Sequence, residues 1–269
     1  MPEGDTVHRI AGRLRADLGG QSLDRLYVQG HGEIGDLQGS AVSGIEVRGK
    51  HMLVHLDRGW SLRVHLGMKG KWAKRPSTER ITVRTAARLD SGPWAFVCNN
   101  AYQTELLKTG HLKAHPRLRA LGPDLLGEPP DLATMVRRAM NPAYGSREIG
   151  DLVLDQRVAS GLGNVYKSEV LFLERIHPRK PVSALSESDM TQIFTRAHTL
   201  MLHNLSTRSR ETVPLKRRPH PGSPRLWVYK RDGQRCLECG TTVERIRQGD
   251  QARSTYFCPG CQPSGANRP

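Results

Sequence analysis

The chain has 269 residues, and its 41 Lys and Arg against 26 Asp and Glu give a formal net charge of +15 and a pI near 10.1. A charge this large favours a polyanionic partner, with nucleic acid as the first interpretation and an anionic membrane surface as the second. There is no run of about 18 uncharged apolar residues, and the first ten residues lack the basic and apolar regions of a secretion signal, which argues against a membrane-spanning or secreted protein. We therefore expect a cytoplasmic protein.

The first predicted element is an amphipathic helix near the start of the chain. Apolar residues recur there at intervals of three and four, at Val7, Ile10, Leu14 and Leu18, with arginines between them. This spacing places them on one face of a helix. A Gly-Gly pair at 19–20 follows, and we expect the helix to end there.

A period of two replaces the helical period in the next hundred residues. Alternating apolar and polar residues are typical of half-buried strands, and Pro and Gly separate the segments. We therefore expect an antiparallel β-sandwich over the first ~120 residues, with the helix packed beside it. The predicted strands lie around residues 45–47, 52–56, 60–66, 81–85 and 94–98.

A Pro- and Gly-rich segment, LGPDLLGEPPD at 121–131, predicts a domain boundary. Helical periodicity follows it. Asp131 and Ser146 can accept hydrogen bonds from first-turn amides, so they are expected to cap helices that end at Ala139 and Leu154.

Two further helices are predicted in the second half of the chain. One starts near Asn164, and the other starts near Ser186, where SESD has a capping-box pattern. Residues 206–225 are rich in Lys, Arg and Pro without periodicity, which indicates a mobile loop. The elements together predict an α+β chain of three domains: an N-terminal helix with an antiparallel β-sandwich at 1–125, a helical domain at 126–222, and a third unit at 223–269, where two CxxC pairs are typical of a zinc ribbon.

Four of the five cysteines form two CxxC pairs separated by eighteen residues. Two such pairs can supply four thiolates to one tetrahedral Zn²⁺, whereas disulfides are less favoured in a reducing compartment. The remaining Cys98 is expected to pack in a core as a small apolar residue. The predicted zinc ligands are Cys236, Cys239, Cys258 and Cys261.

The sequence Gly161-Leu162-Gly163-Asn164 lies between two helical patterns. Its glycines allow a tight turn, and a helix that opens at Asn164 would present free amides and the positive end of its dipole to a phosphate. An ordinary link between two helices is an equally good interpretation of this motif alone.

The N-terminal residues Met1-Pro2-Glu3-Gly4-Asp5 offer a third site. Removal of Met1 ahead of a small residue would leave Pro2 with a free secondary amine. A terminal α-amine titrates near pH 8, so part of it is unprotonated at neutral pH and can attack a sugar carbon to form an iminium adduct. The adjacent Glu3 could then transfer protons. A simple turn ahead of a helix is the alternative.

Taken together and in this order, the three motifs resemble the formamidopyrimidine-DNA glycosylase and endonuclease VIII family of bifunctional base-excision enzymes. The resemblance covers nearly the whole chain, and the terminal PEG favours the endonuclease VIII branch. The segments that carry it are PEG at 2–4, RGKHMLVHL at 48–56, HLGMKGKW at 65–72, LGPDLL at 121–126, LDQRVASGLGNVYKSEVLF at 154–172, YKRDGQRCLECG at 229–240 and YFCPGCQ at 256–262.

The resemblance implies roles for individual residues. Pro2 would be the nucleophile that displaces the base and forms a Schiff base, and Glu3 would be the general acid and base. Lys50, on the RGK strand, would bind a phosphate and the sugar region, and an ordinary exposed strand lysine is the alternative. Asn164, at the helix opening of a helix-two-turn-helix motif, and Arg253, on the zinc hairpin, would hold the phosphates that flank the lesion.

Enzymes of this kind extrude a nucleotide, so a side chain has to fill the gap in the stack. Met68 is our candidate, because an apolar residue exposed beside Gly67 and Gly70 can insert between bases. The alternative is a Met that tucks under its own loop.

Two departures limit the resemblance. The family usually has Pro and then Glu after PEG, whereas this chain has Asp5 and Thr6, so a second carboxylate is missing from its expected position. Asp5 could substitute for it, or either residue could cap the first helix.

The resemblance implies a DNA glycosylase and AP lyase that acts on damaged double-stranded DNA, with one structural Zn²⁺ and no membrane partner. We expect oxidised pyrimidines as substrates, strand nicking by β,δ-elimination, and action as a monomer. The alternatives are an oxidised-purine glycosylase of the same family and a non-catalytic zinc-ribbon DNA-binding protein on the same fold.

Overall fold

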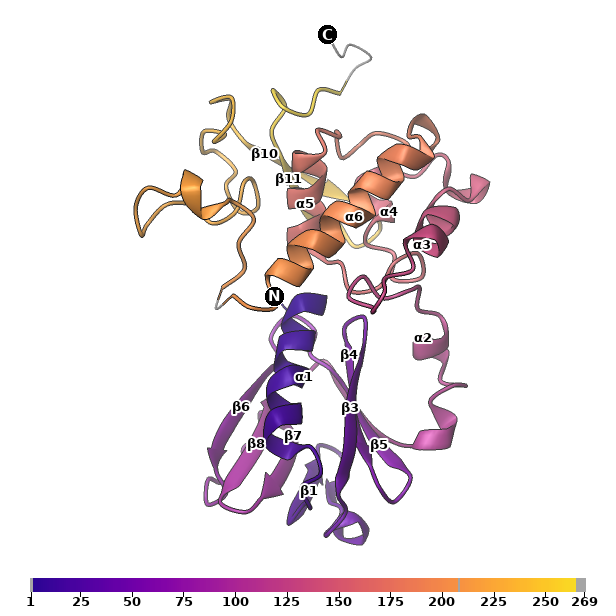
Figure 1. Cartoon of the computed structure of the whole chain (residues 1–269), viewed down its shortest axis with the longest axis vertical. Helices are drawn as coiled ribbons and strands as arrows, with labels where there is room; N and C mark the ends of the chain where they lie inside the picture. The colour runs from indigo at the N-terminus through magenta and orange to yellow at the C-terminus, as the bar shows by residue number, and fades with distance from the viewer. Residues whose placement is uncertain (1, 208, 265–269) are drawn as a thin grey trace. The chain divides into compact units, whose positions relative to one another are not determined.

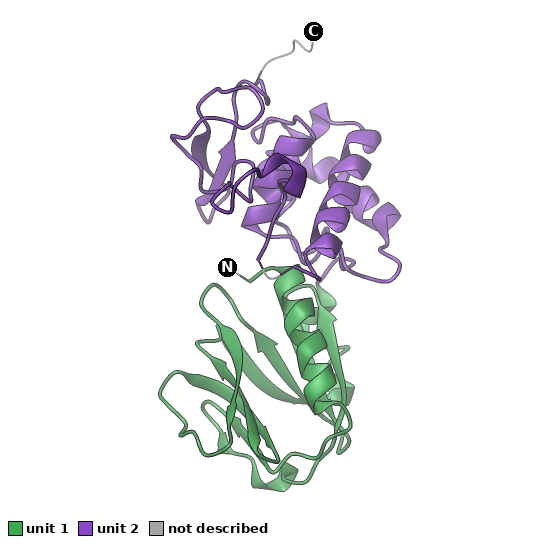
Figure 2. Ribbon diagram, turned by 60° about the vertical axis from the view of Figure 1, so that its left-hand side comes forward, with its two compact units in different colours: residues 1–120 green, residues 121–269 purple. Residues whose placement is uncertain are grey.

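The computed structural model describes residues 2–207 and 209–264, and the chain forms two compact units, residues 1–120 and 121–269 (Figure 1, Figure 2). The elements of the first unit are α1 (Gly4–Leu18), β1 (Arg25–Val28), β2 (Gly32–Glu33), η1 (Gly35–Leu37), β3 (Val42–Arg48), β4 (His51–Leu56), β5 (Trp60–His65), β6 (Lys71–Pro76), β7 (Thr85–Ser91), β8 (Trp94–Asn99), β9 (Gln103–Lys108), η2 (Thr109–His111) and α2 (Pro116–Arg119).

The N-terminal helix forms as its apolar spacing predicts. Val7, Leu14 and Leu18 are buried on the face of α1 that packs on β3 and β4. The helix starts three residues earlier than the apolar pattern does, at Gly4, and it ends at Leu18, where the Gly19 N–H donates to the Arg15 carbonyl at 2.9 Å.

The strands form two antiparallel sheets that enclose one apolar core. One sheet has the order β2-β1-β7-β8-β6 and the other has the order β3-β4-β5-β9. Alternation puts Met52 and Leu62 of the second sheet, and Leu89 and Phe96 of the first sheet, into the same buried cluster as α1. Burial of this cluster is the main term that stabilises the unit. The predicted helix and antiparallel sandwich are confirmed.

The predicted strand at 81–85 is wrong. Residues 77–84 form a loop, and the next strand, β7, starts only at Thr85. The buried Arg88 holds the loop, because its guanidinium donates to the carbonyls of Ser77 and Glu79. The Thr85 N–H donates to the Thr82 carbonyl and closes a turn, which leaves Val83 fully exposed.

The second unit combines helices with one β-hairpin. Its elements are α3 (Leu132–Ala139), η3 (Pro142–Tyr144), α4 (Ile149–Leu152), α5 (Asn164–Leu173), η4 (Val182–Ala184), α6 (Glu187–His203), η5 (Leu215–Arg217), β10 (Glu244–Gln248) and β11 (Arg253–Phe257). The predicted caps at Asp131 and Ser186 are confirmed, the latter as a full capping box. The cap predicted at Ser146 is wrong, since α4 starts after Glu148.

Helix α5 is the centre of the second unit, and all but its last residue are buried. Tyr166 and Val170 face the helical core that α3, α4 and α6 complete. Phe172 faces a separate cluster built from the hairpin and the segment before it, where it stacks on Trp227 with ring centroids 5.6 Å apart. One helix therefore joins the helical part to the zinc ribbon.

A buried carboxylate fixes the chain segment that leads into the ribbon. Glu169 of α5 is fully buried, and it accepts hydrogen bonds from the N–H groups of Trp227, Val228 and Tyr229 at 2.7–3.0 Å and from the Thr212 hydroxyl. Burial raises the pKa of Glu169, and these four donors act in the opposite direction. The described part of the 206–225 loop closes at its neck, where Thr212 and Val213 donate to the Arg225 carbonyl.

None of the helices in the described residues is long and apolar enough to cross a membrane. The predicted boundary near residue 125 falls close to the division between the two units, and the one at 222/223 falls inside the second unit. The division into three domains stays a prediction.

Candidate functional site

The predicted nucleophile Pro2 and the predicted proton-transfer residue Glu3 lie at the start of α1. Pro2 is half-buried and Glu3 is fully buried. Glu3 is the residue before the first helical turn, with extended backbone angles of φ −125° and ψ −176°, and its carbonyl accepts from the Val7 N–H. A carboxylate at this position interacts favourably with the positive end of the helix dipole. The start of the helix therefore holds a buried acidic residue directly after Pro2.

Asp5 and Thr6, which stand where a second acidic residue was expected, belong to the first turn of α1 and do not cap it. Asp5 is buried, and the Thr6 hydroxyl donates to its carboxylate at 3.3 Å. Asp5 is therefore the one carboxylate in the first turn of α1, two residues after Glu3.

Lys50 lies in the turn at the tip of the β3–β4 hairpin and not within a strand, where the sequence placed it. Arg48 and His51 pair across the hairpin, so Gly49 and Lys50 form a two-residue turn. Gly49 has φ +60°, which the first central position of a type II′ turn requires and glycine adopts without strain. The turn fixes the point from which the Lys50 side chain departs.

Met68 lies in the loop between β5 and β6 and is 67% exposed, so it does not tuck under its own loop. Tyr102 is 69% exposed and adjoins this loop: its N–H donates to the Leu66 carbonyl, and its Cβ leaves no room for a side chain at Gly67. The first unit thus presents two large exposed side chains on adjoining segments. Tyr102 was not predicted from the sequence, because only the pairing of β5 with β9 brings it here.

Two neutral histidines lie beside the Lys50 turn. The ring centroids of His51 and His65 are 4.7 Å apart. Burial, together with the charges of His65 and Arg63, lowers the pKa of His51 to about 3. Burial, together with the charges of Lys50 and Arg63, lowers the pKa of His65 to about 4. At neutral pH, the two imidazoles therefore add no positive charge beside Lys50.

The lowered pKa of His51 predicts a pH-dependent stability. The folded state keeps His51 neutral, whereas the unfolded chain binds a proton below its ordinary pKa of 6.5. The free energy of unfolding is therefore unaffected by this group above pH 6.5 and falls as the pH drops towards 3, by about 2 kcal/mol at pH 5. Urea unfolding at pH 7 and at pH 5 measures this fall in the free energy of unfolding. His51→Gln should lose less stability between these pH values than the wild type, and equal losses would contradict the prediction.

In the second unit, the predicted glycine motif forms the turn before α5. Gly161 has φ +103°, and the side chain of Gln156 braces the turn by accepting from the Gly161 N–H and donating to the Leu162 carbonyl. Gly163 caps the helix, and Asn164 is its first residue. The Asn164 amide nitrogen donates to the Ser254 carbonyl at 2.6 Å, while its Oδ1 has no hydrogen-bond partner among the described residues.

Arg253 is the first residue of β11, directly before Ser254. The structure thus brings the α5 opening and the start of β11 together. Gln248, opposite Arg253 in the hairpin, is buried and donates to the Glu148 carboxylate at 2.6 Å and to the Pro178 carbonyl at 3.0 Å. These bonds dock the hairpin beside α4, and the Arg253 guanidinium donates to the Gln251 side chain at 2.6 and 3.0 Å.

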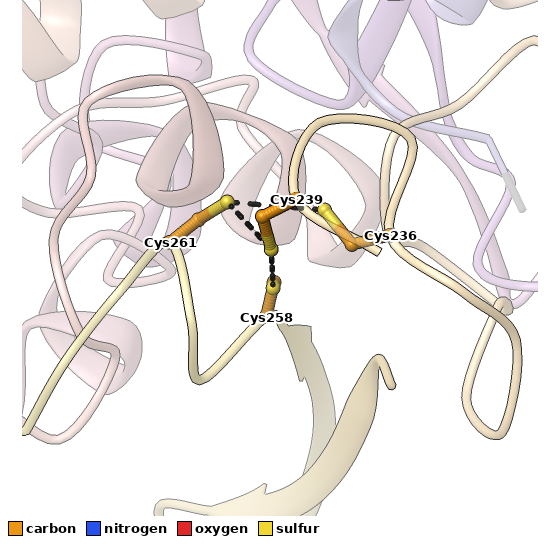
Figure 3. Close-up of side chains that lie close together, drawn as sticks. All are labelled: Cys236, Cys239, Cys258 and Cys261. Atoms are coloured by element: carbon orange, nitrogen blue, oxygen red, sulfur yellow. Dashed lines mark hydrogen bonds between the residues drawn. The ribbon is translucent and has the colours of Figure 1, made fainter. Parts of the chain in front are cut away.

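The four clustered cysteines converge at the end of the hairpin, as Figure 3 shows. Their sulfur atoms all lie within 4.8 Å of one another, and the closest pairs are 3.4–3.8 Å apart. Tetrahedral Zn–S bonds of about 2.3 Å require sulfur separations of about 3.8 Å. The donor set fits one Zn²⁺, and the predicted cofactor is confirmed. Cys98 is separate and buried in the sandwich core, where burial raises the pKa of its thiol to about 12.

Models of three domains match the chain in sequence order. The formamidopyrimidine-DNA glycosylase N-terminal domain matches residues 1–99, the formamidopyrimidine-DNA glycosylase H2TH domain matches residues 121–213, and the zinc finger found in FPG and IleRS matches residues 233–263.

Curated relatives match over the full length. A protein of Streptomyces coelicolor named "Probable endonuclease 8 2" is 35% identical over 100% of this chain and 96% of its own length. "DNA-(apurinic or apyrimidinic site) lyase Nei2" of Mycolicibacterium smegmatis is also 35% identical, over 97% of this chain and 99% of its own. Among solved structures, Lactococcus lactis Fpg in complex with abasic-site DNA has a TM-score of 0.80 at 23% identity, over 97% of this chain and 100% of that one.

Proposed function

The chain belongs to the formamidopyrimidine-DNA glycosylase family, and from this premise we propose that it is a bifunctional DNA glycosylase and AP lyase of base excision repair that prefers oxidised pyrimidines. The observation that carries the proposal is the N-terminus, where Pro2 leads directly into a helix that begins beside a buried Glu3. The matches to all three domains in order support it. We place the protein on cytoplasmic DNA as a monomer.

The proposed chemistry starts at the Pro2 nitrogen. Its lone pair attacks C1′ of the damaged nucleotide, the C1′–base bond breaks, and Glu3 gives a proton to the leaving base or to the opening sugar ring. Loss of the ring oxygen from C1′ leaves an iminium between Pro2 and the sugar. The iminium makes the C2′ protons acidic, and loss of one of them expels the 3′ phosphate by β-elimination. The conjugated iminium that results makes the C4′ proton acidic, and its loss expels the 5′ phosphate by δ-elimination. Hydrolysis of the iminium restores Pro2.

We assign the DNA contacts to residues of both units. We assign a phosphate contact to Lys50 at its hairpin tip, and insertion into the vacated stack to the exposed Met68. Asn164 and Arg253 hold phosphates beside the lesion, because the α5 opening carries the positive end of the helix dipole and Arg253 adds a positive charge next to it. The zinc is structural, because four thiolates fill its coordination shell.

The phosphate assignment predicts the effect of removing Arg253 or Asn164. Arg253→Ala and Asn164→Ala should each weaken DNA binding about tenfold, equally for every base sequence, because phosphates carry no sequence information. The slope of log K against log salt should fall by about 0.9 for each phosphate that the variant no longer neutralises. Arg245→Ala is the matched control, since it removes the same charge from the other face of the same hairpin. Unchanged affinity and slope in Arg253→Ala would refute the assignment.

Substrate preference is tested by direct comparison of lesions. Single-turnover base release is measured on duplexes that contain 5-hydroxyuracil or 8-oxoguanine at the same position. We expect faster release of 5-hydroxyuracil. Faster release of 8-oxoguanine would instead establish a purine glycosylase. Tight binding without release of either base, together with an abasic-site duplex that stays uncleaved, would establish a non-catalytic binder.

A further inference from the structure

The four-stranded sheet has one face in the apolar core and a second face that is mostly polar, with Leu53 and Leu107 as its apolar members, although much of it is buried. On this outer face lie Glu46 and Arg48 of β3, His51 and His55 of β4, Ser61, Arg63 and His65 of β5, and Gln103 and Glu105 of β9. Residues 109–119 lie near the end of the first unit, which extends to residue 120. They contact this face through Thr109 and His115. Leu112 and Leu118 of the same segment are buried.

One series of hydrogen bonds runs across the outer face from β3 to this segment. Arg48 donates to Glu46 at 2.5 Å, and the Glu46 carboxylate lies 3.3 Å from the His55 ring. The other nitrogen of His55 bonds to the Ser61 hydroxyl at 2.8 Å, and Ser61 bonds to the Thr109 hydroxyl at 2.8 Å. The series therefore links Arg48 to Thr109.

A second series crosses the same face. The Arg63 guanidinium donates to His51 Nδ1 at 2.7 Å and to Glu105 at 2.9 Å. The same carboxylate oxygen lies 3.0 Å from His115 Nε2. His115 Nδ1 accepts from the Leu118 N–H, so its Nε2 carries the proton that is donated to Glu105. This series links His51 to helix α2.

Both series start at the residues that flank the Lys50 turn, because Arg48 and His51 are its two stems. We propose that Arg63 and Glu105 are positioning residues that hold this turn through His51, with segment 109–119 as their support. The inference rests on the proposed function, since it assigns a purpose to the geometry of Lys50.

The ion pair between the fully buried Arg63 and the half-buried Glu105 is better explained by positioning than by stability. Arg63 is fully buried, and its second terminal nitrogen makes no hydrogen bond to the described residues. Removing charges from water costs free energy that a buried pair rarely recovers, and apolar residues of similar size are often as stable or more so. A guanidinium fork, however, fixes His51 and Glu105 in one geometry, which an apolar contact does not. Contacts that act on a reacting substrate need such precision.

The test replaces the pair by apolar side chains. The double variant Arg63→Met with Glu105→Leu removes one positive and one negative charge, so the net charge of the chain stays the same. We expect the variant to unfold at a urea concentration similar to that of the wild type, but to bind abasic-site DNA about tenfold more weakly. The salt slope should fall by about 0.9, the amount that one phosphate accounts for, although the buried Arg63 cannot reach a phosphate.

A double-mutant cycle with Lys50→Ala shows whether the effect passes through Lys50. We expect Lys50→Ala alone to weaken binding, and the paired replacement to add no further loss in that background. An undiminished further loss would overturn the inference and leave the function intact. An unchanged affinity of the folded pair variant would overturn it too. If Lys50→Ala alone has no effect, the assigned role of Lys50 fails, and the inference fails with it.

A milder pair of variants covers the case in which the buried replacement does not fold. His115→Phe cuts the link from Glu105 to segment 109–119, whereas His111→Phe changes an exposed histidine of the same segment. We expect His115→Phe to weaken DNA binding and to lower the salt slope, and His111→Phe to do neither. Equal behaviour of the two variants would overturn the support assigned to the segment.

Discussion

A chain whose Pro2 nitrogen is blocked will not form a covalent complex with abasic DNA when borohydride is added. The reason is chemical: only an amine can condense with the sugar aldehyde to an iminium, and borohydride reduces that iminium to a stable amine. The wild type, with Met1 removed, is expected to give a trapped species in good yield. A form that retains one extra residue ahead of Pro2 should give none and should lose strand cleavage with it. Intact mass measurement identifies which N-terminus is present.

Glu3→Gln separates the nucleophile from proton transfer. This variant keeps the Pro2 amine, so trapping on preformed abasic DNA is expected to persist. Release of a damaged base should fall about 10²- to 10⁴-fold, the usual contribution of a positioned acid. For the other variant, the chain whose Pro2 nitrogen is blocked, strand cleavage at the wild-type rate would refute the imine mechanism. Loss of trapping in Glu3→Gln would instead show that Glu3 is needed to form the adduct itself.

Several regular elements of both units follow from local sequence patterns, whereas strands β1, β6, β7 and β9 were not predicted. The one wrong strand prediction has an identifiable physical cause. The spacing of Val7 and Leu18 is enough to specify α1, and Ser186 is enough to start α6. Ile81 and Val83 alternate as a strand would, but the buried Arg88 decides the conformation, because it holds the loop backbone through the carbonyls of residues 77 and 79. Periodicity carries no information on such a tertiary hydrogen bond.

The residues of the candidate site also divide into those that the sequence predicts and those that only the structure shows. CxxC spacing predicts the zinc ligands, because neighbouring thiolates on one turn suit one ion. The outer-face network was not predicted, because Arg63 and Glu105 become neighbours only through the register of β5 on β9. Likewise, nothing in the local sequence shows that Glu169 bonds to three amides near Trp227, 58 or more residues away. Residues that work by position across strands need the structure.

Loss of one zinc ligand is expected to unfold the ribbon and to abolish tight DNA binding. Cys239→Ala leaves three thiolates, and structural zinc in finger peptides contributes about 10–16 kcal/mol of coupled binding and folding free energy. Cys236 and Cys258 share a cluster with Trp227 and Tyr256, so release of the metal should open that cluster. The measurements are the amount of bound zinc, the tryptophan fluorescence, to which Trp227 contributes as one of four tryptophans, and the affinity for DNA.

The coupling between metal and DNA follows from the hydrogen bonds of the hairpin. Asn164 donates to the Ser254 carbonyl, and Arg253 precedes that residue, so an unfolded hairpin removes Arg253 and releases the Asn164 side chain at once. Cys239→Ala should therefore lower the salt slope at least as much as Arg253→Ala does, by the amount of about one phosphate, and should weaken binding more than Arg253→Ala because the uncharged Asn164 contact is lost as well. Cys98→Ala, a thiol change outside the cluster, should keep its zinc and its slope. A Cys239→Ala protein that retains metal and wild-type affinity would show that the ribbon does not carry the phosphate contacts.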